Sequence, residues 1–251
     1  MNIQISKYDP TVGGAPSLVS YNVAWHQNMT VLEAIQFAHQ SSPVSFDYNC
    51  HGRACGRCAV TLDGTPVLAC ITPITNATHT IEPLGGHAVL RDLIVDKSQA
   101  HAALSTIYNR VKNPAHDLTK DAVIENTYNT NAIAQIDAIE WCCRCLMCTS
   151  ECPVYNANPA TFVGPAALLA IAYRFYDAYD AGNRIAEAVQ GGLWNCIMCG
   201  LCDDVCPQKE IHRVQQIWRD LRTAATAAGS PNPYNADHPN PYAKLAPSKG
   251  R

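Results

Sequence analysis

Several features that define large classes of proteins are missing from this 251-residue sequence. Charged residues make up only 16% of it, and the formal net charge of −3 gives no electrostatic basis for binding nucleic acid. The longest apolar run, residues 166–173, is far shorter than the roughly 20 residues of a membrane-spanning helix. We therefore expect no nucleic-acid partner and no transmembrane segment.

Two sequence motifs are also missing. The first ten residues, MNIQISKYDP, have no basic stretch followed by an apolar one, so we expect no secretory signal. The sequence contains no G-x-G-x-x-G run, so it offers no dinucleotide fingerprint of its own. Hydrophobic residues still reach 47%, which is enough for packed cores and argues against wholesale disorder.

Cysteine is the residue that the sequence has in excess, with 13 in all. Residues 141–153 read WCCRCLMCTSECP and place four cysteines at C-x2-C-x2-C-x3-C-P spacing: Cys142, Cys145, Cys148 and Cys152. The same spacing returns 54 residues later at Cys196, Cys199, Cys202 and Cys206. A third group near the front comprises Cys50, Cys55, Cys58 and Cys70. Tight C-x2-C groups without a secretory signal indicate metal ligation in a reduced compartment, because disulfide-stapled folds spread their cysteines.

The front group has the C-x4-C-x2-C spacing of a plant-type [2Fe–2S] cluster, with a shorter gap to the last ligand. We expect Cys50, Cys55, Cys58 and Cys70 to hold that cluster. Gly52 and Gly56 lack the Cβ that would keep the loop away from it. A four-cysteine zinc site is the alternative, but zinc sites usually pair two C-x2-C knuckles. A Rieske centre needs two histidine ligands, and His51 is not spaced as one, so it is expected at the surface.

The two rear boxes have the spacing of a bacterial two-cluster run, in which the fourth cysteine ligates the other cluster. If this rule applies here, one [4Fe–4S] cluster is held by Cys142, Cys145, Cys148 and Cys206. The other is held by Cys196, Cys199, Cys202 and Cys152. Cys143 fits no ligand spacing and is expected to be a buried spare thiol. The chain is thus predicted to carry electrons and to contain no catalytic residue.

The first 104 residues favour a small β-grasp sheet. Residues 3–8 and 18–25 alternate as strands, and Thr30 with Glu33 forms a capping box that opens a helix to about Gln40. Further strands are expected at 59–62, 66–69 and 78–83, with an Asp63-Gly64 hairpin turn. A short helix is expected at 89–95.

Helical patterns dominate from residue 105 onward, with apolar stripes at 162–176 and 211–228. We therefore predict an α+β protein: an N-terminal β-grasp [2Fe–2S] domain (1–104) and an all-α bacterial-ferredoxin-like two-cluster domain (105–228). Residues 229–251, rich in Pro, Asn and Ser, form an extended or disordered tail.

This combination resembles the iron–sulfur subunit of succinate dehydrogenases and fumarate reductases. Residues 89–96 (VLRDLIVD) and 164–175 (GPAALLAIAYRF) are similar to that family as well. The resemblance implies electron transfer between an FAD-containing flavoprotein subunit, which interconverts succinate and fumarate, and a membrane-anchor or quinone-side subunit. It also implies a cytoplasmic protein, peripheral to the inner face of the cell membrane through its partners.

The sequence departs from the family pattern at two places. Most members lack a cysteine at the position of Cys199 and carry a [3Fe–4S] cluster there, whereas this chain has the fourth ligand for a second [4Fe–4S]. Quinone-reducing relatives have Trp and His where this chain has Ala157 and Ile197. The sequence therefore resembles a non-classical branch whose partner is a cysteine-rich quinone- or thiol-side subunit.

Three alternatives remain open. The same set of three clusters could transfer electrons for another flavoprotein, such as a thiol-linked fumarate reductase or a glycolate or glycerol-3-phosphate dehydrogenase. A free ferredoxin carrier is a second interpretation, although such carriers are usually smaller and more acidic. A zinc-stapled interaction protein is the third, and it would be colourless.

Overall fold

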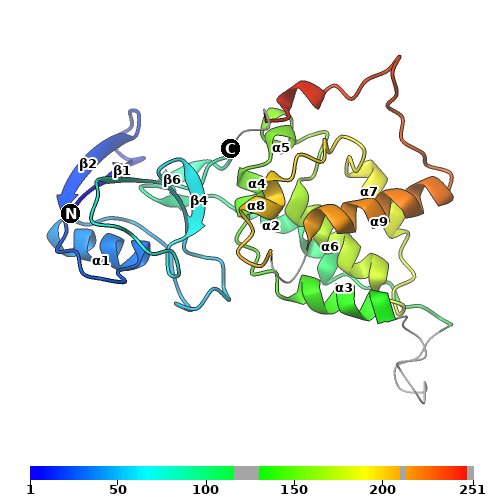
Figure 1. Ribbon diagram of the computed structural model, residues 1–251, viewed down its shortest axis with the longest axis horizontal. Helices are drawn as coiled ribbons and strands as arrows, with labels where there is room; N and C mark the ends of the chain where they lie inside the picture. The colour runs from blue at the N-terminus through cyan, green and yellow to red at the C-terminus, as the bar shows by residue number, and fades with distance from the viewer. Residues whose placement is uncertain (116–129, 210–212, 248–251) are drawn as a thin grey trace. The chain divides into compact units, whose positions relative to one another are not determined.

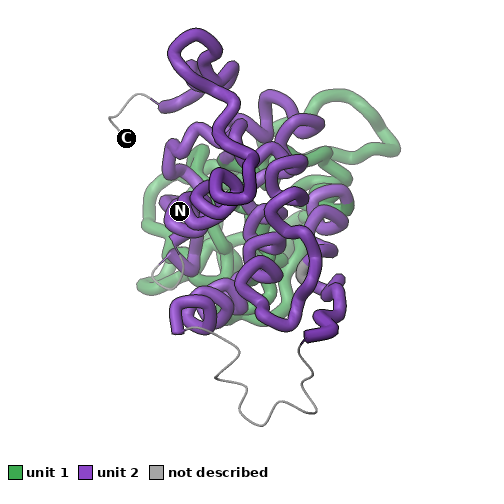
Figure 2. The backbone as a smooth tube through the Cα atoms, turned by 90° about the vertical axis from the view of Figure 1, so that its right-hand side faces the viewer, with its two compact units in different colours: residues 1–98, 143–151 green, residues 99–142, 152–251 purple. Residues whose placement is uncertain are grey.

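The computed structural model describes residues 1–115, 130–209 and 213–247. The chain divides into two compact units (Figure 2). Unit 1 comprises residues 1–98 and 143–151, and unit 2 comprises residues 99–142 and 152–251. Part of the first rear cysteine box therefore belongs to unit 1, whereas the chain on either side of it belongs to unit 2.

Unit 1 is built on a mixed five-stranded sheet with the order β2-β1-β5-β3-β4 (Figure 1). β1 pairs in parallel with β5, and the other neighbours are antiparallel. Ile3 and Ile5 of β1 and Ile81 of β5 are fully buried. The strands span β1 Asn2–Lys7, β2 Ser17–Asn22, β3 Ala59–Leu62, β4 Thr65–Leu68 and β5 His79–Glu82.

Two local signals in unit 1 are confirmed. Helix α1 (Val31–Ser41) begins at the expected capping box, in which Glu33 N donates to Thr30 Oγ1 (3.2 Å) and Thr30 N donates to Glu33 Oε2 (2.7 Å). Asp63 and Gly64 both have positive φ and connect β3 to β4 as a two-residue hairpin turn.

The helix predicted at residues 89–95 is wrong. The chain forms a hairpin there, with β6 (Val89–Arg91) and β7 (Ile94–Val95) joined at Asp92, which has a left-handed φ of 47°. The Asp92 carboxylate accepts hydrogen bonds from Lys7 Nζ, Tyr8 N and Ser45 N. These contacts come from distant parts of unit 1, so the local apolar pattern does not decide the structure.

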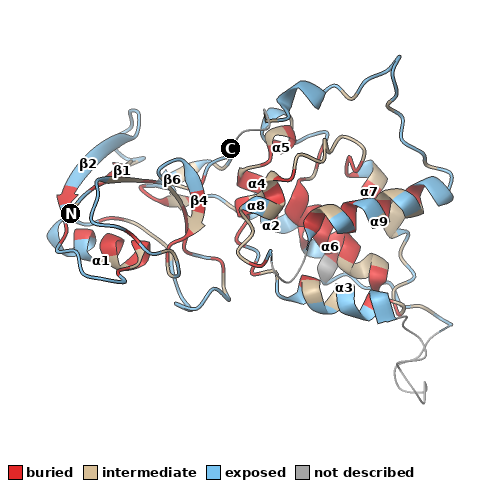
Figure 3. Ribbon diagram, viewed as in Figure 1, coloured by how far each residue is buried: buried red, intermediate tan, exposed pale blue. Residues whose placement is uncertain are grey.

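Unit 2 is helical and forms around α6 (Pro165–Tyr176), which contacts α3, α7, α9 and η1. Figure 3 shows α6 mostly buried, whereas α9 buries one face that includes Val214, Trp218 and Leu221. The predicted start of the last helix, Ile211, lies outside the described residues. The remaining elements are α2 Ser98–Ala103, η1 Ser105–Ile107, α3 Thr130–Glu140, α5 Pro153–Ala157, α7 Arg184–Gln190, α8 Leu201–Asp204, α9 Val214–Ala227 and η3 Ala243–Leu245, while α4 (Met147–Ser150) belongs to unit 1.

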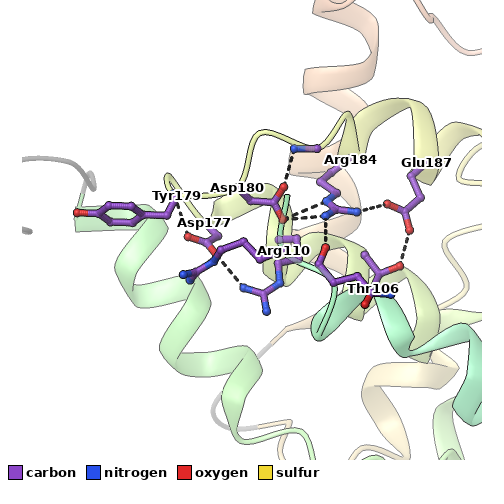
Figure 4. A network of polar contacts seen from close by, with 10 residues as sticks. Thr106, Arg110, Asp177, Tyr179, Asp180, Arg184 and Glu187 are labelled. Carbon is purple, nitrogen blue, oxygen red and sulfur yellow. Dashed lines mark hydrogen bonds and ion pairs between the residues drawn. The ribbon is translucent and has the colours of Figure 1, made fainter. Parts of the chain in front are cut away.

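A network of ion pairs ties the loop before α7 to the chain around η1 (Figure 4). Arg184 is the centre of this network: it pairs with Asp180 (2.8 Å) and Glu187 (2.7 Å) and donates to Asn109 O. Thr106 donates to Glu187. The Asp180 side chain is fully buried, so Arg184 neutralises a carboxylate that water cannot reach.

The segment after α9 lies against unit 2 as a largely extended arm. Asn240 Nδ2 donates to the carbonyls of Trp194 (3.0 Å) and Asn195 (3.1 Å), and the hydroxyls of Tyr242 and Thr161 are 2.5 Å apart. Within the described ranges, every helix falls short of the length and apolar character needed to cross a membrane.

Candidate iron–sulfur sites

The front cysteine loop folds around the sulfur of Cys50. The backbone N–H groups of Gly52, Ala54 and Cys55 lie 3.3–3.4 Å from Cys50 Sγ. His51 (φ 53°) and Arg53 (φ 64°) hold left-handed conformations that turn the backbone inward. Three donors aimed at one sulfur favour a thiolate there.

The structure brings front cysteines together in pairs, Cys50 with Cys55 and Cys58 with Cys70. Hydrogen bonds from Gly52 and its neighbours lower the pKa of Cys50 to about 7, and the Cys55 side chain contributes as well. Burial, together with the nearby Cys70 and Cys55 thiols, raises the pKa of Cys58 to about 12. None of the four is in a disulfide, and their sharing of one cluster stays a prediction.

Gly56 and Gly52 differ in how closely they are packed. A Cβ on Gly56, which has a φ of 65°, would lie 2.4 Å from the carbonyl oxygen of Cys143 and 2.8 Å from Cα of Cys145. A Cβ on Gly52 would meet only Cys50 O, at 3.7 Å. Position 56 therefore requires glycine because any Cβ there would clash with the backbone of the first rear box. The role expected for Gly52, close approach to the cluster, stays a prediction.

Other residues of the front loop behave as surface groups. His51 is exposed, as expected. Arg57 pairs with Asp47 (2.9 Å) through side chains that are both largely exposed. A pair of this kind contributes little to stability.

The first rear box places its cysteines in both units. Cys145 and Cys148 belong to unit 1, whereas Cys142 and Cys206 belong to unit 2, and their shared cluster stays a prediction from the spacing. Cys143 is buried, as expected, with 8% of its surface exposed. A hydrogen bond with Cys145 lowers the pKa of Cys143 to about 7.

The second rear box surrounds a cavity in unit 2. Its walls include all four cysteines assigned to the second tetranuclear cluster: Cys152, Cys196, Cys199 and Cys202. Burial, with a smaller contribution from the nearby Cys196 and Cys199 thiols, raises the pKa of Cys152 to about 11. The fourth cysteine of the first box thus lies beside the second box, where the spacing rule places it.

The two boxes share a backbone path as well as a spacing. Arg144 (φ 54°) and Leu146 (φ 67°) in the first box match Met198 (φ 54°) and Gly200 (φ 92°) in the second. A short helix follows at the same step, α4 after Leu146 and α8 after Gly200. Three of these left-handed residues are not glycine, so the surrounding loop must offset their strain.

The donor sets fit iron–sulfur clusters. The front group and the group of Cys152, Cys196, Cys199 and Cys202 each offer four thiols that are not in disulfides. The front loop adds inward N–H groups of the kind that hydrogen-bond to cluster sulfur. Among the described residues, no three His, Cys, Asp or Glu side chains converge as one bound ion would require. When bound, such clusters accept and release single electrons.

Two residues that are not ligands lie near the second box, and the sequence analysis did not identify them as part of the site. Trp218 lines the cavity of the four cysteines, and Arg222 donates through Nη2 to the carbonyls of Cys196 (2.5 Å) and Leu193 (3.1 Å). The apolar helical stripe at 211–228 includes Trp218 and predicts only that it is buried. Their positions one turn apart on that helix were the available signal.

Comparison with protein families agrees with this division of the chain. Residues 2–102 match the model of a 2Fe-2S iron-sulfur cluster binding domain. Residues 138–210 match the model of a 4Fe-4S dicluster domain. The α+β fold class, with a ferredoxin-like sheet domain before a helical two-cluster domain, is therefore confirmed.

Individual proteins are similar over most of the chain. The fumarate reductase iron-sulfur subunit of Mycobacterium tuberculosis is 32% identical over 238 residues, which cover 90% of this chain and 93% of that protein. A subunit of the fumarate reductase (CoM/CoB) of Methanothermobacter marburgensis is 29% identical over 92% of this chain, which spans 45% of that longer protein. One polypeptide of the Mycobacterium smegmatis Sdh1 complex in the apo form has the same fold, with a TM-score of 0.78 at 21% identity over 90% of this chain and 95% of that polypeptide.

Proposed function

This chain belongs to the family of fumarate reductase and succinate dehydrogenase iron–sulfur subunits, and from that premise we propose that it relays electrons through one [2Fe–2S] and two [4Fe–4S] clusters. The flow runs between an FAD-containing flavoprotein subunit and a membrane-anchor or cysteine-rich subunit on the quinone or thiol side. Chemistry on the dicarboxylate belongs to the flavoprotein. The chain is placed at the cytoplasmic face of the membrane through these partners.

The observation that supports a complete second [4Fe–4S] cluster is the cavity of the second box. Cys199, the ligand that most relatives lack, lines it together with Cys152, Cys196 and Cys202. Phe162 and Trp218, both at most 1% exposed, close its wall and exclude water. Four thiols around one space match the ligand set of a [4Fe–4S] cluster.

The remaining ligands are proposed with the same assignments as above. Cys50, Cys55, Cys58 and Cys70 hold the [2Fe–2S] cluster, in a loop whose N–H groups stabilise negative sulfur. Cys142, Cys145, Cys148 and Cys206 hold the first [4Fe–4S] cluster. The role of this chain is to hold the three centres and to shield the buried ligands from water.

A thiol-side partner is the second candidate, and one residue favours it. Ile197, where quinone-reducing relatives have His, lines both the four-cysteine cavity and an adjacent pocket. An isoleucine cannot donate a hydrogen bond to a quinone oxygen. The Methanothermobacter relative, named for CoM and CoB, is consistent with an acceptor other than a quinone.

Iron content and EPR test the cluster assignment. The anaerobically purified full chain should hold about ten irons. Cys199→Ser should lower that number and produce an oxidised [3Fe–4S] signal. Cys143→Ser is the matched control, because Cys143 is buried but is not an assigned ligand. A [3Fe–4S] signal in the unaltered protein, or a loss of iron in Cys143→Ser equal to that in Cys199→Ser, would contradict the assignment.

Capture of the native complex tests the partners. A tagged chain should co-purify with a flavoprotein that oxidises succinate or reduces fumarate. Succinate oxidation by the isolated chain alone would overturn the division of labour.

A further inference from the structure

Trp218 of α9 is a buried donor without an acceptor. Its side chain is fully buried, and its Nε1–H has no hydrogen-bond partner among the described residues. Leaving a buried donor unpaired is destabilising, and buried polar groups almost always have a partner. An indole N–H in this position needs an acceptor that the described residues do not supply.

The space beside Trp218 is the cavity lined by Cys152, Cys196, Cys199 and Cys202. Its other walls are mainly apolar, including Val154, Phe162 and Leu201. Gln215 also lines the cavity, but it does not accept from the indole. The sulfur atoms of the four cysteines line the same cavity as Trp218, and a cluster held by them would place further sulfur acceptors there.

We infer that Trp218 Nε1–H donates a hydrogen bond to the cluster held by Cys152, Cys196, Cys199 and Cys202, and thereby raises the reduction potential of that cluster. This inference rests on the proposed function, because it requires that the second box holds a cluster. In this role Trp218 is not a ligand of the cluster. Its hydrogen bond stabilises the reduced state of the cluster relative to the oxidised state.

Arg222 acts in the same direction from one turn further along α9. Its Nη2 donates to the carbonyl oxygen of Cys196, and its guanidinium lies 5.2 Å from the centre of the Trp194 ring. Its Nε, like the Trp218 nitrogen, is buried without a partner among the described residues. A single helix thus presents an N–H donor and a positive charge to the second box.

The sign of the effect follows from charge. Reduction adds one electron to a cluster that is already anionic with its thiolates, so a donor or a cation stabilises the reduced form more than the oxidised form. Hydrogen bonds to sulfur and net charge are among the properties that set the potentials of iron–sulfur clusters. Loss of the Trp218 N–H should therefore favour the oxidised cluster.

Redox titration followed by EPR tests this inference on the full chain with its clusters in place. Trp218→Phe keeps an aromatic ring but removes the N–H. At a fixed potential it should lower the ratio of reduced to oxidised second cluster about tenfold, which for one electron is about 59 mV. Tyr176→Phe is the control, because it removes a buried hydroxyl that donates to Asp220 of α9 but does not line the cavity.

A spectroscopic readout identifies the donor directly. With 15N in the indole ring of tryptophan, the reduced cluster should show a 15N hyperfine coupling that persists in Trp194→Phe and disappears in Trp218→Phe. This measurement also decides the matter in the unaltered fold if Trp218→Phe lowers stability.

The outcomes separate this inference from the proposed function. A loaded second cluster with an unchanged potential in Trp218→Phe, or without 15N coupling in the unaltered protein, overturns the role of Trp218 alone. A protein that lacks about four of the expected irons and has no second tetranuclear signal overturns the proposed function as well.

Discussion

Replacing Asp92 with alanine should release the β6–β7 hairpin from the rest of unit 1. The Asp92 side chain is 4% exposed and accepts from Lys7 Nζ (2.6 Å), Tyr8 N (3.0 Å) and Ser45 N (2.7 Å). Burial alone would raise the pKa of Asp92, but these hydrogen bonds outweigh it and hold the pKa below its ordinary value of 3.8. A carboxyl of this kind contributes fully at neutral pH, and its contribution is lost only as the pH falls through the lowered pKa.

The magnitude follows from the groups left behind. Two backbone N–H groups would lose a charged acceptor, at about 1.5 kcal/mol each on the low side of the usual range. Lys7 is a quarter exposed and adds less than about 1 kcal/mol. The sum is at least about 3 kcal/mol, which corresponds to roughly a 100-fold change in a local opening equilibrium.

Amide hydrogen exchange near neutral pH measures that opening. Leu93 N donates to Ser45 O across the hairpin contact, so its exchange should accelerate about 100-fold in Asp92→Ala. Asp9→Ala is the matched control, because Asp9 pairs with Arg91 of the same hairpin through more exposed side chains. Equal acceleration in the two variants would refute the assignment of Asp92 as the anchor.

Three further changes test other parts of the chain. Gly56→Ala should bleach the front-cluster absorbance at a lower temperature than Gly52→Ala, because only the Gly56 Cβ meets backbone at under 3 Å; equal bleaching would contradict the close approach. Thr30→Ala should lower the free energy of unfolding by about 1 kcal/mol through loss of the capping box, and no change in a denaturant melt would count against it. Arg184→Met should lower it by about 3–5 kcal/mol, because Asp180 is left buried and unpaired, and a loss no larger than that of Thr30→Ala would argue against the network.

Local sequence signals predicted the parts of the fold that depend on near neighbours. Thr30 and Glu33 are three residues apart, and Asp63-Gly64 is a two-residue turn, so each motif fixes its own geometry. The cysteine spacings predicted the two cluster-binding domains for the same reason, since the distance along the chain limits which thiols can reach one cluster, while the individual ligand assignments stay predictions. The family likeness and both cluster domains could therefore be predicted from the residues alone.

Features that depend on contacts between distant residues were not predictable. The hairpin at Asp92 exists because Lys7, Tyr8 and Ser45 converge on its carboxylate from elsewhere in unit 1. The tail after α9 was expected to be extended or disordered, and its hydrogen bonds through Asn240 could not be inferred from its composition. An apolar helical stripe likewise predicts that Trp218 is buried, but it does not predict which groups lie near the indole Nε1.

The two rear boxes bend at matching positions, as two copies of one segment would. Left-handed steps recur at the same two places, Arg144 and Leu146 in one box and Met198 and Gly200 in the other, although the side chains differ. A copied segment keeps its path when the metal it encloses tolerates no other, while the residues along it drift. Duplication of one segment would leave this arrangement, and the ligand exchange proposed above would then join the two copies through their last cysteines.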